Sequence, residues 1–136
     1  MGWQEPKTDW TADDRLNYQD YNRIKNNLEY LREQASEMNG EFLIEDMGPD
    51  MQSNLESWKV RFFNAFESNV DTINANIFTQ DYGIRQKFYD NGPFIRFAEL
   101  NRLESAILGM KNVVDGTKAG RRRLVFRLGG MKGLRV

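Results

Sequence analysis

Apolar residues recur every three or four positions along three long stretches of this chain, which is the spacing of one face of an α-helix. The first stretch predicts a helix from about residue 18 to about residue 38, because polar residues fill the positions between the apolar ones. Asn17 and Asp20 have the spacing of a loose capping box at its start, and Asn39-Gly40 is typical of a helix end. The apolar face of this predicted helix consists of Tyr21, Ile24, Leu28, Leu31, Ala35 and Met38.

The second and third stretches have the same spacing. A helix is predicted over roughly residues 52–78, starting at the capping box of residues 53–56, and another over about 97–115, ended by Gly116. The apolar face of the second helix consists of Leu55, Trp58, Phe62, Phe66, Val70, Ile73 and Ile77. That of the third consists of Leu100, Leu103, Ile107, Met110 and Val114.

The pattern changes near the C-terminus. Apolar residues alternate with mainly basic ones over residues 123–128, and a period of two predicts a β-strand. After Gly129-Gly130, residues 133–136 could return as a second strand, and residues 42–44 could form another short one. We therefore expect a mainly α fold of three amphipathic helices with a short C-terminal β-strand or hairpin. An α+β fold is the alternative.

The length of 136 residues suits a single domain with a core of its own. We divide the expected domain, residues 1–136, into three parts. These are an N-terminal lead-in arm (1–16), a helical body (17–117) and a basic C-terminal β segment (118–136).

The absence of cysteine and histidine from the sequence narrows the possible chemistry. It removes disulfides, thiolate and imidazole catalysis and most zinc or copper sites. No phosphate-binding loop, dinucleotide-binding glycine pattern or calcium-binding loop is present either. Paired acids at 13–14 and 45–46 could bind a cation or act as acid and base, but such loop pairs are usually solvated. We predict no enzyme activity, no cofactor and no metal. A hydrolase that relies on carboxylates alone is the least favoured hypothesis.

No apolar run approaches the ~20 residues of a membrane span. The N-terminus also lacks the basic and hydrophobic regions of a signal peptide. We therefore expect synthesis in the cytoplasm and no membrane partner.

Charge is distributed unevenly along the chain. Residues 118–136 hold seven basic residues and no acidic one, which leaves 12 basic and 20 acidic residues in the other 117. A basic segment beside an acidic body can pair within one chain or between neighbouring chains. The lead-in tryptophans either pack on the chain's own core or anchor a partner. The candidate partner-binding residues are Trp3, Trp10, Arg122, Phe126 and Arg127.

The arginine run could instead bind nucleic acid through its phosphates. The acidic body and the placement of these arginines on a predicted strand argue against that interpretation. A small nucleic-acid-binding or regulatory protein therefore remains the alternative function.

The first and third predicted helices share more than apolar spacing. At an offset of 79 residues, Asn22-Arg23 matches Asn101-Arg102 identically and Asp20 matches Glu99. Helical periodicity does not require the polar Asn-Arg pair, so the match suggests either two similar helices packed as a pair or a duplicated docking element.

The opening Trp3-Gln4-Glu5-Pro6-Lys7-Thr8-Asp9-Trp10-Thr11, continued by residues 17–24, resembles a motif of phages that infect Gram-positive bacteria. In that group, W-x-x-P-K-T-x-W followed by a D-Y-N-R-I helix recurs in small structural proteins of the siphophage tail tip and adsorption apparatus. Residues 99–104 and 124–130 also resemble segments of the group. These pieces lie towards both ends of the chain, which as a whole resembles a small tail-region gene product of a Bacillus siphophage.

The resemblance implies a non-enzymatic virion protein, made in the host cytoplasm and located in the tail. Its implied partners are other phage tail proteins, with a homo-oligomer as a further possibility. The resemblance supplies no catalytic or cofactor-binding residues.

Overall fold

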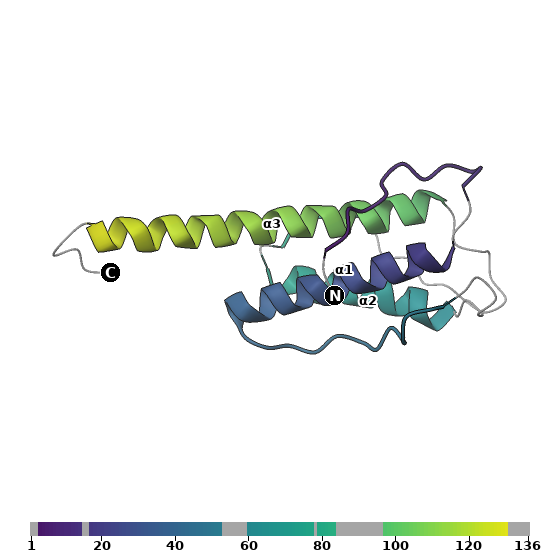
Figure 1. Ribbon diagram of the computed structural model, residues 1–136, viewed down its shortest axis with the longest axis horizontal. Coiled ribbons are helices and arrows are strands. Elements are labelled where there is room, and N and C mark those ends of the chain that lie inside the picture. Colours follow the sequence, from purple (N-terminus) through teal and green to yellow (C-terminus); the bar gives the residue numbers. More distant parts are fainter. Residues whose placement is uncertain (1–2, 15–16, 53–59, 78, 84–96, 131–136) are drawn as a thin grey trace.

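Three helices make up the fold, in the order α1 (Tyr18–Asn39), α2 (Val60–Ala75) and α3 (Phe97–Gly130) (Figure 1). The structure is a computed structural model that describes residues 3–14, 17–52, 60–77, 79–83 and 97–130, with only the backbone at 60–62 and 121–130. No strand occurs within these ranges. The mainly α prediction is therefore confirmed.

Helix α1 has nearly the predicted bounds. Its predicted capping box is present, since Asp20 N donates to Asn17 Oδ1 at 3.0 Å and Asn17 N donates to Asp20 Oδ2 at 3.0 Å. At the other end, Gly40 adopts a φ of 96°, which favours glycine, and its N–H donates to Ser36 O. These local signals fix both ends of the helix.

Helix α2 ends at Ala75, a few residues before the predicted position. The capping box predicted at residues 53–56 lies outside the described residues. Phe66, Val70 and Ile73 of the predicted apolar face are buried, as expected.

Two predictions for the C-terminal part of the chain were wrong. Gly116 does not end helix α3, and residues 124–128 are helical rather than a strand, because α3 continues to Gly130. A glycine inside a helix costs only about 1 kcal/mol relative to alanine, and the leucines and arginines that follow favour helix. The basic segment at 118–130 is therefore part of α3, while the proposed return at 133–136 lies outside the described residues.

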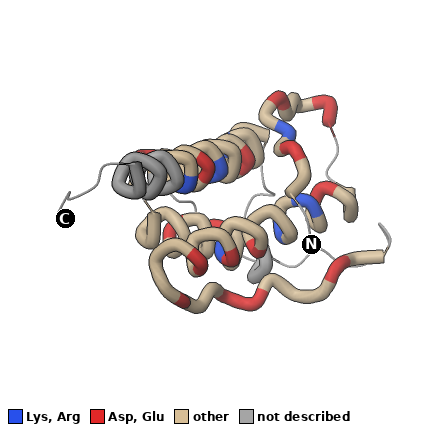
Figure 2. The backbone as a smooth tube through the Cα atoms, turned by 60° about the vertical axis from the view of Figure 1, so that its left-hand side comes forward, with Lys and Arg blue, Asp and Glu red and all other residues tan. Residues whose placement is uncertain are grey.

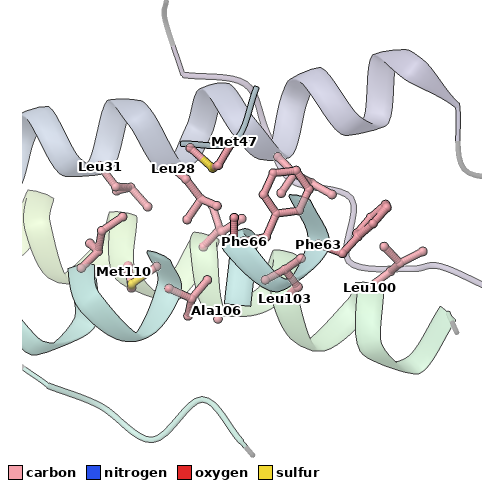
Figure 3. Packing of buried hydrophobic residues seen from close by; sticks show 14 of the residues in the cluster. Leu28, Leu31, Met47, Phe63, Phe66, Leu100, Leu103, Ala106 and Met110 are labelled. Carbon is pink, nitrogen blue, oxygen red and sulfur yellow. The ribbon is translucent and has the colours of Figure 1, made fainter. Parts of the chain in front are cut away.

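Each helix packs against the other two. Figure 3 shows side chains from all three meeting between them, with Phe66 of α2 close to the α1 and α3 residues. The predicted faces of α1 and α3 supply much of this core, because all of their residues except the partly buried Met38 are buried. From α1 these are Tyr21, Ile24, Leu28, Leu31 and Ala35, and from α3 they are Leu100, Leu103, Ile107, Met110 and Val114.

Two extended segments flank the bundle (Figure 1). The lead-in of residues 3–14 lies along α1 and α3, and residues 40–52 run back along the side of α1 that faces away from α3. Residues 42–44, which could have formed a short strand, are irregular. Helix α3 is much longer than its neighbours and projects past both of them at its C-terminal end.

None of the described helices combines the length and the apolar character that a membrane crossing requires.

Candidate functional site

A buried carboxylate on α3 joins the lead-in to the bundle. Glu104 is 0% exposed, and Arg23 of α1 donates to both of its oxygens, from Nε at 2.8 Å and from Nη2 at 2.8 Å. Two donors come from the lead-in, the Lys7 backbone N at 3.1 Å and Trp10 Nε1 at 2.5 Å. Four donors therefore compensate the removal of this charge from water.

Arg23 also contacts Asp20 one turn earlier, from Nη1 to Oδ1 at 2.7 Å. Burial by itself lowers the pKa of Arg23, but its hydrogen bonds to Glu104 and Asp20 outweigh burial, so the pKa is raised. The guanidinium is therefore permanently charged. Such a cluster fixes the position of elements and offers neither a free base nor a nucleophile.

The second copy of the Asn-Arg pair builds a similar cluster. Arg102 donates from Nη2 to Glu67 of α2, which is only 2% exposed, and from Nε to Glu99 at 3.2 Å. Its pKa is also raised: burial opposes this change, and the bonds to Glu67 and Glu99 more than offset burial. In both copies an arginine bonds an acid one turn earlier and a buried glutamate of another helix.

The asparagines of the two copies also play the same part. The Asn22 amide donates to Met51 O at 2.9 Å and accepts from Met51 N at 2.8 Å. The Asn101 amide donates to Trp10 O at 2.9 Å and accepts from Trp10 N at 2.7 Å. Each side chain thus pairs with an extended backbone as a neighbouring strand would. The repeated polar pair therefore attaches one extended segment and one helix in each copy.

Two further asparagines outside the repeat do the same. Asn27 bonds Gln4 N and O at 2.9 and 2.7 Å, and Asn69 bonds Glu45 N and O at 2.7 and 3.0 Å. We call Asn22, Asn27, Asn69 and Asn101 the four backbone-binding asparagines. They hold both extended segments in place without any strand pairing.

The two lead-in tryptophans differ in exposure. Trp10 is 4% exposed and belongs to the core, which was one of its two predicted alternatives. Trp3 is half-buried, with its ring centroid 5.8 Å from that of Tyr30 and 5.4 Å from Lys111 Nζ. Of this pair, only Trp3 keeps surface that a partner can reach.

The other candidate residues, Arg122, Phe126 and Arg127, lie on the projecting part of α3. Their side chains are outside the described part of the structure. The helix carries them away from the lead-in, so the five candidate residues do not form one site.

A hollow of about 350 Å³ lies between α1 and residues 43–47, away from the lead-in. We call it the acidic hollow because four carboxylates and one guanidinium line it. Leu43 at its edge is 85% exposed. Sequence reasoning treated Glu45 and Asp46 as solvated loop acids and did not place them beside α1. The acidic hollow is lined by Glu29, Arg32, Glu33, Leu43, Ile44, Glu45, Asp46 and Met47.

Sequence reasoning also missed the roles of Glu104 and Glu67. Each directly follows a core residue of its helix, Leu103 and Phe66, but neighbouring helical residues point in different directions, so this position does not predict burial. Within the part of the chain that the structure describes, no three acidic side chains gather in a way that could hold a metal ion.

Comparisons with known proteins found no matching family model, no matching curated protein and no matching solved structure.

Proposed function

We propose that this chain is a non-enzymatic structural or adaptor protein of a siphophage tail tip. In this role it makes protein–protein contacts in the host-adsorption apparatus, and it is located in the virion tail. Its partners are other tail proteins and further copies of itself.

One observation carries the proposal. The residues that resemble the tail-tip motif, although separated in sequence, meet around Glu104: Trp10 and Lys7 from W-x-x-P-K-T-x-W, and Arg23 from D-Y-N-R-I. Pro6 of the same motif is buried as well. The resemblance therefore concerns one folded unit, a lead-in attached to two helices, rather than two unrelated short matches.

The contacts also distinguish residues that stabilise the fold from residues that are available to bind a partner. Most motif residues bond within the chain, so they explain a shared fold better than a shared partner. Contact with other virion proteins is therefore assigned to parts of the chain that do not take part in these bonds: the projecting end of α3, with Arg122, Phe126 and Arg127, and the accessible part of Trp3.

Mass spectrometry of purified particles, from the phage that encodes this chain, tests the location. We expect the chain in washed virions at a fixed ratio to the other tail proteins. Its absence from particles, together with no binding of the purified chain to any recombinant tail protein, would overturn the proposal.

The contact surface is tested by pull-down with recombinant tail proteins. Arg122→Gln combined with Arg127→Gln should weaken binding by about tenfold or more if these residues contact an acidic partner. Ser105→Glu combined with Asn112→Glu changes net charge equally on exposed α3 positions within the bundle and should not.

A second candidate function is favoured by one structural finding. The arginines of residues 121–127 lie on a projecting helix rather than on a strand, and a basic helix is a common nucleic-acid-binding element. This removes one of the two sequence arguments against nucleic acid, while the acidic body remains.

A DNA titration at about 50 mM and about 200 mM salt distinguishes this candidate, because binding that neutralises several phosphates weakens by orders of magnitude over that range. Micromolar binding with such a salt dependence would favour the nucleic-acid candidate. No binding at the lower salt would exclude it.

A further inference from the structure

The acidic hollow is a preformed surface. Its outer wall, residues 43–47, is held at three points: Arg32 Nε donates to Phe42 O at 3.1 Å, Asn69 binds the Glu45 backbone, and Tyr21 Oη donates to Met47 O. The inner wall is helix α1. A ligand would therefore meet a fixed shape.

Its surface combines apolar and acidic groups. Leu43 is 85% exposed, against 45% for Phe97, and these are the two large apolar residues exposed in the described part of the chain. Figure 2 shows acidic residues spaced along residues 40–52, the segment beneath the helices. Glu29 has a cation at 3.6 Å, Lys25 Nζ, but that amine lies closer to Asp50, at 2.6 Å. The hollow thus retains an excess of negative charge around an exposed leucine.

The chain itself contains a segment with the complementary chemistry. Residues 121–128, Arg-Arg-Arg-Leu-Val-Phe-Arg-Leu, combine four arginines with four apolar residues and no acid. They lie on the part of α3 that projects past α1 and α2 (Figure 1). A continuous helix that leads away from the bundle cannot bend back to the hollow of its own chain. A basic helix that occupies the acidic hollow must therefore come from another molecule.

We propose that the acidic hollow binds the projecting end of α3, residues 118–130, of a second copy of this chain. The interface is heterologous, because each copy offers a hollow at one place and a basic helix at another. Repetition of such a contact gives a closed ring if its rotation closes and an open filament if it does not. The inference rests on the proposed function, which it deepens by naming one partner of the basic helix.

Sedimentation velocity of the full chain over a concentration series, at about 50 mM and about 300 mM salt, measures this association. We expect species larger than the monomer at the lower salt and a shift towards monomer at the higher salt. A chain that stays monomeric at every concentration at the lower salt would overturn the inference.

Two charge-reversal variants test the surfaces. The hollow variant carries Glu33→Lys and Glu45→Lys, and the helix variant carries Arg122→Glu and Arg127→Glu. Each should weaken self-association by at least about tenfold, because like charges then face each other. Glu5→Lys with Asp13→Lys is the matched control for the hollow variant: it reverses two exposed acids of the lead-in and should associate like the original chain.

Mixing the two defective variants gives the sharpest result. The hollow variant still has a native basic helix and the helix variant still has a native hollow, so the mixture should form complexes that neither forms alone. Failure of the mixture to associate, with both variants folded by circular dichroism, would overturn the head-to-tail arrangement in favour of contact between like surfaces.

The outcomes also separate this inference from the proposed function. A strictly monomeric chain that is nevertheless found in virions and binds another tail protein overturns the inference alone. A chain that assembles head to tail but is absent from virions supports the inference and removes the proposed function.

Discussion

Replacement of Glu104 by glutamine should be the most damaging near-isosteric change in the described bundle. The substitution removes the charge that Arg23 contacts through two bonds of 2.8 Å each. The Lys7 N–H donates to one carboxylate oxygen and Trp10 Nε1 donates to the other, so an amide NH₂ in either place removes an acceptor from the lead-in. At least one donor then faces another donor inside the core.

The expected loss follows from these contacts. Removing one charged partner of a buried ion pair costs about 3–5 kcal/mol, because the other charge stays buried with fewer partners. Arg23 keeps its bond to Asp20, so we place the loss in the free energy of unfolding near the lower end, at about 3 kcal/mol. Against a typical total of about 5–15 kcal/mol, this is a large fraction of the stability.

Urea unfolding, followed by far-ultraviolet circular dichroism and by tryptophan fluorescence, measures the change. Glu5→Gln, on an exposed position of the lead-in, is the control and should change stability by less than about 0.5 kcal/mol. A loss of less than about 1 kcal/mol for Glu104→Gln would show that the buried carboxylate does not stabilise the packing of α1, α3 and the lead-in. A double-mutant cycle with Arg23→Gln isolates the energy of the pair itself.

Three other substitutions test separate features. Asn101→Ala removes both bonds to the Trp10 backbone and should cost about 1–3 kcal/mol in urea unfolding, with hydrogen exchange at the Trp10 amide accelerated; unchanged exchange would contradict the role of the amide. Gly116→Ala with Gly120→Ala should stabilise the chain by up to about 1 kcal/mol per site and raise helical dichroism, since an added Cβ meets nothing within 4 Å at either residue; lower helicity would argue against a continuous α3. Burial raises the pKa of the Tyr82 hydroxyl above its ordinary 10.0, so the folded chain loses this proton at a higher pH than the unfolded chain does. The corresponding stability is therefore present below pH 10.0 and is lost as pH rises through the folded pKa. Tyr82→Phe should therefore lose less stability than the original chain between pH 8 and pH 11 in urea titrations, and parallel losses would refute this.

Much of the bundle was predictable because short-range chemistry determines it. The apolar spacing of α1 identified its buried face, and Asn17 with Gly40 marked its ends, since capping and positive φ are local properties. The C-terminal half of α3 was not predictable in this way. A six-residue alternation of apolar and basic residues is too short to exclude helix, and Gly116 resembles a helix end when only its immediate neighbours are considered.

The polar contacts were only partly accessible from sequence. The repeated Asn-Arg pair indicated that α1 and α3 share polar residues that helical periodicity does not require. However, its partners lie far along the chain, since Arg23 bonds Glu104 and Arg102 bonds Glu67. Nothing local connects these residues, so only the folded arrangement identifies the two glutamates. The same holds for the acidic hollow, whose walls come from α1 and from the segment that follows it.

The four backbone-binding asparagines have a consequence for how related chains would diverge. An asparagine side chain that hydrogen-bonds a backbone N–H and C=O does not depend on the side chain of that residue, so an exposed position such as Gln4 can vary while Asn27 opposite it cannot. Distant relatives with this fold would then share a few scattered asparagines and arginines, while the exposed positions of the extended segments could differ without altering the architecture.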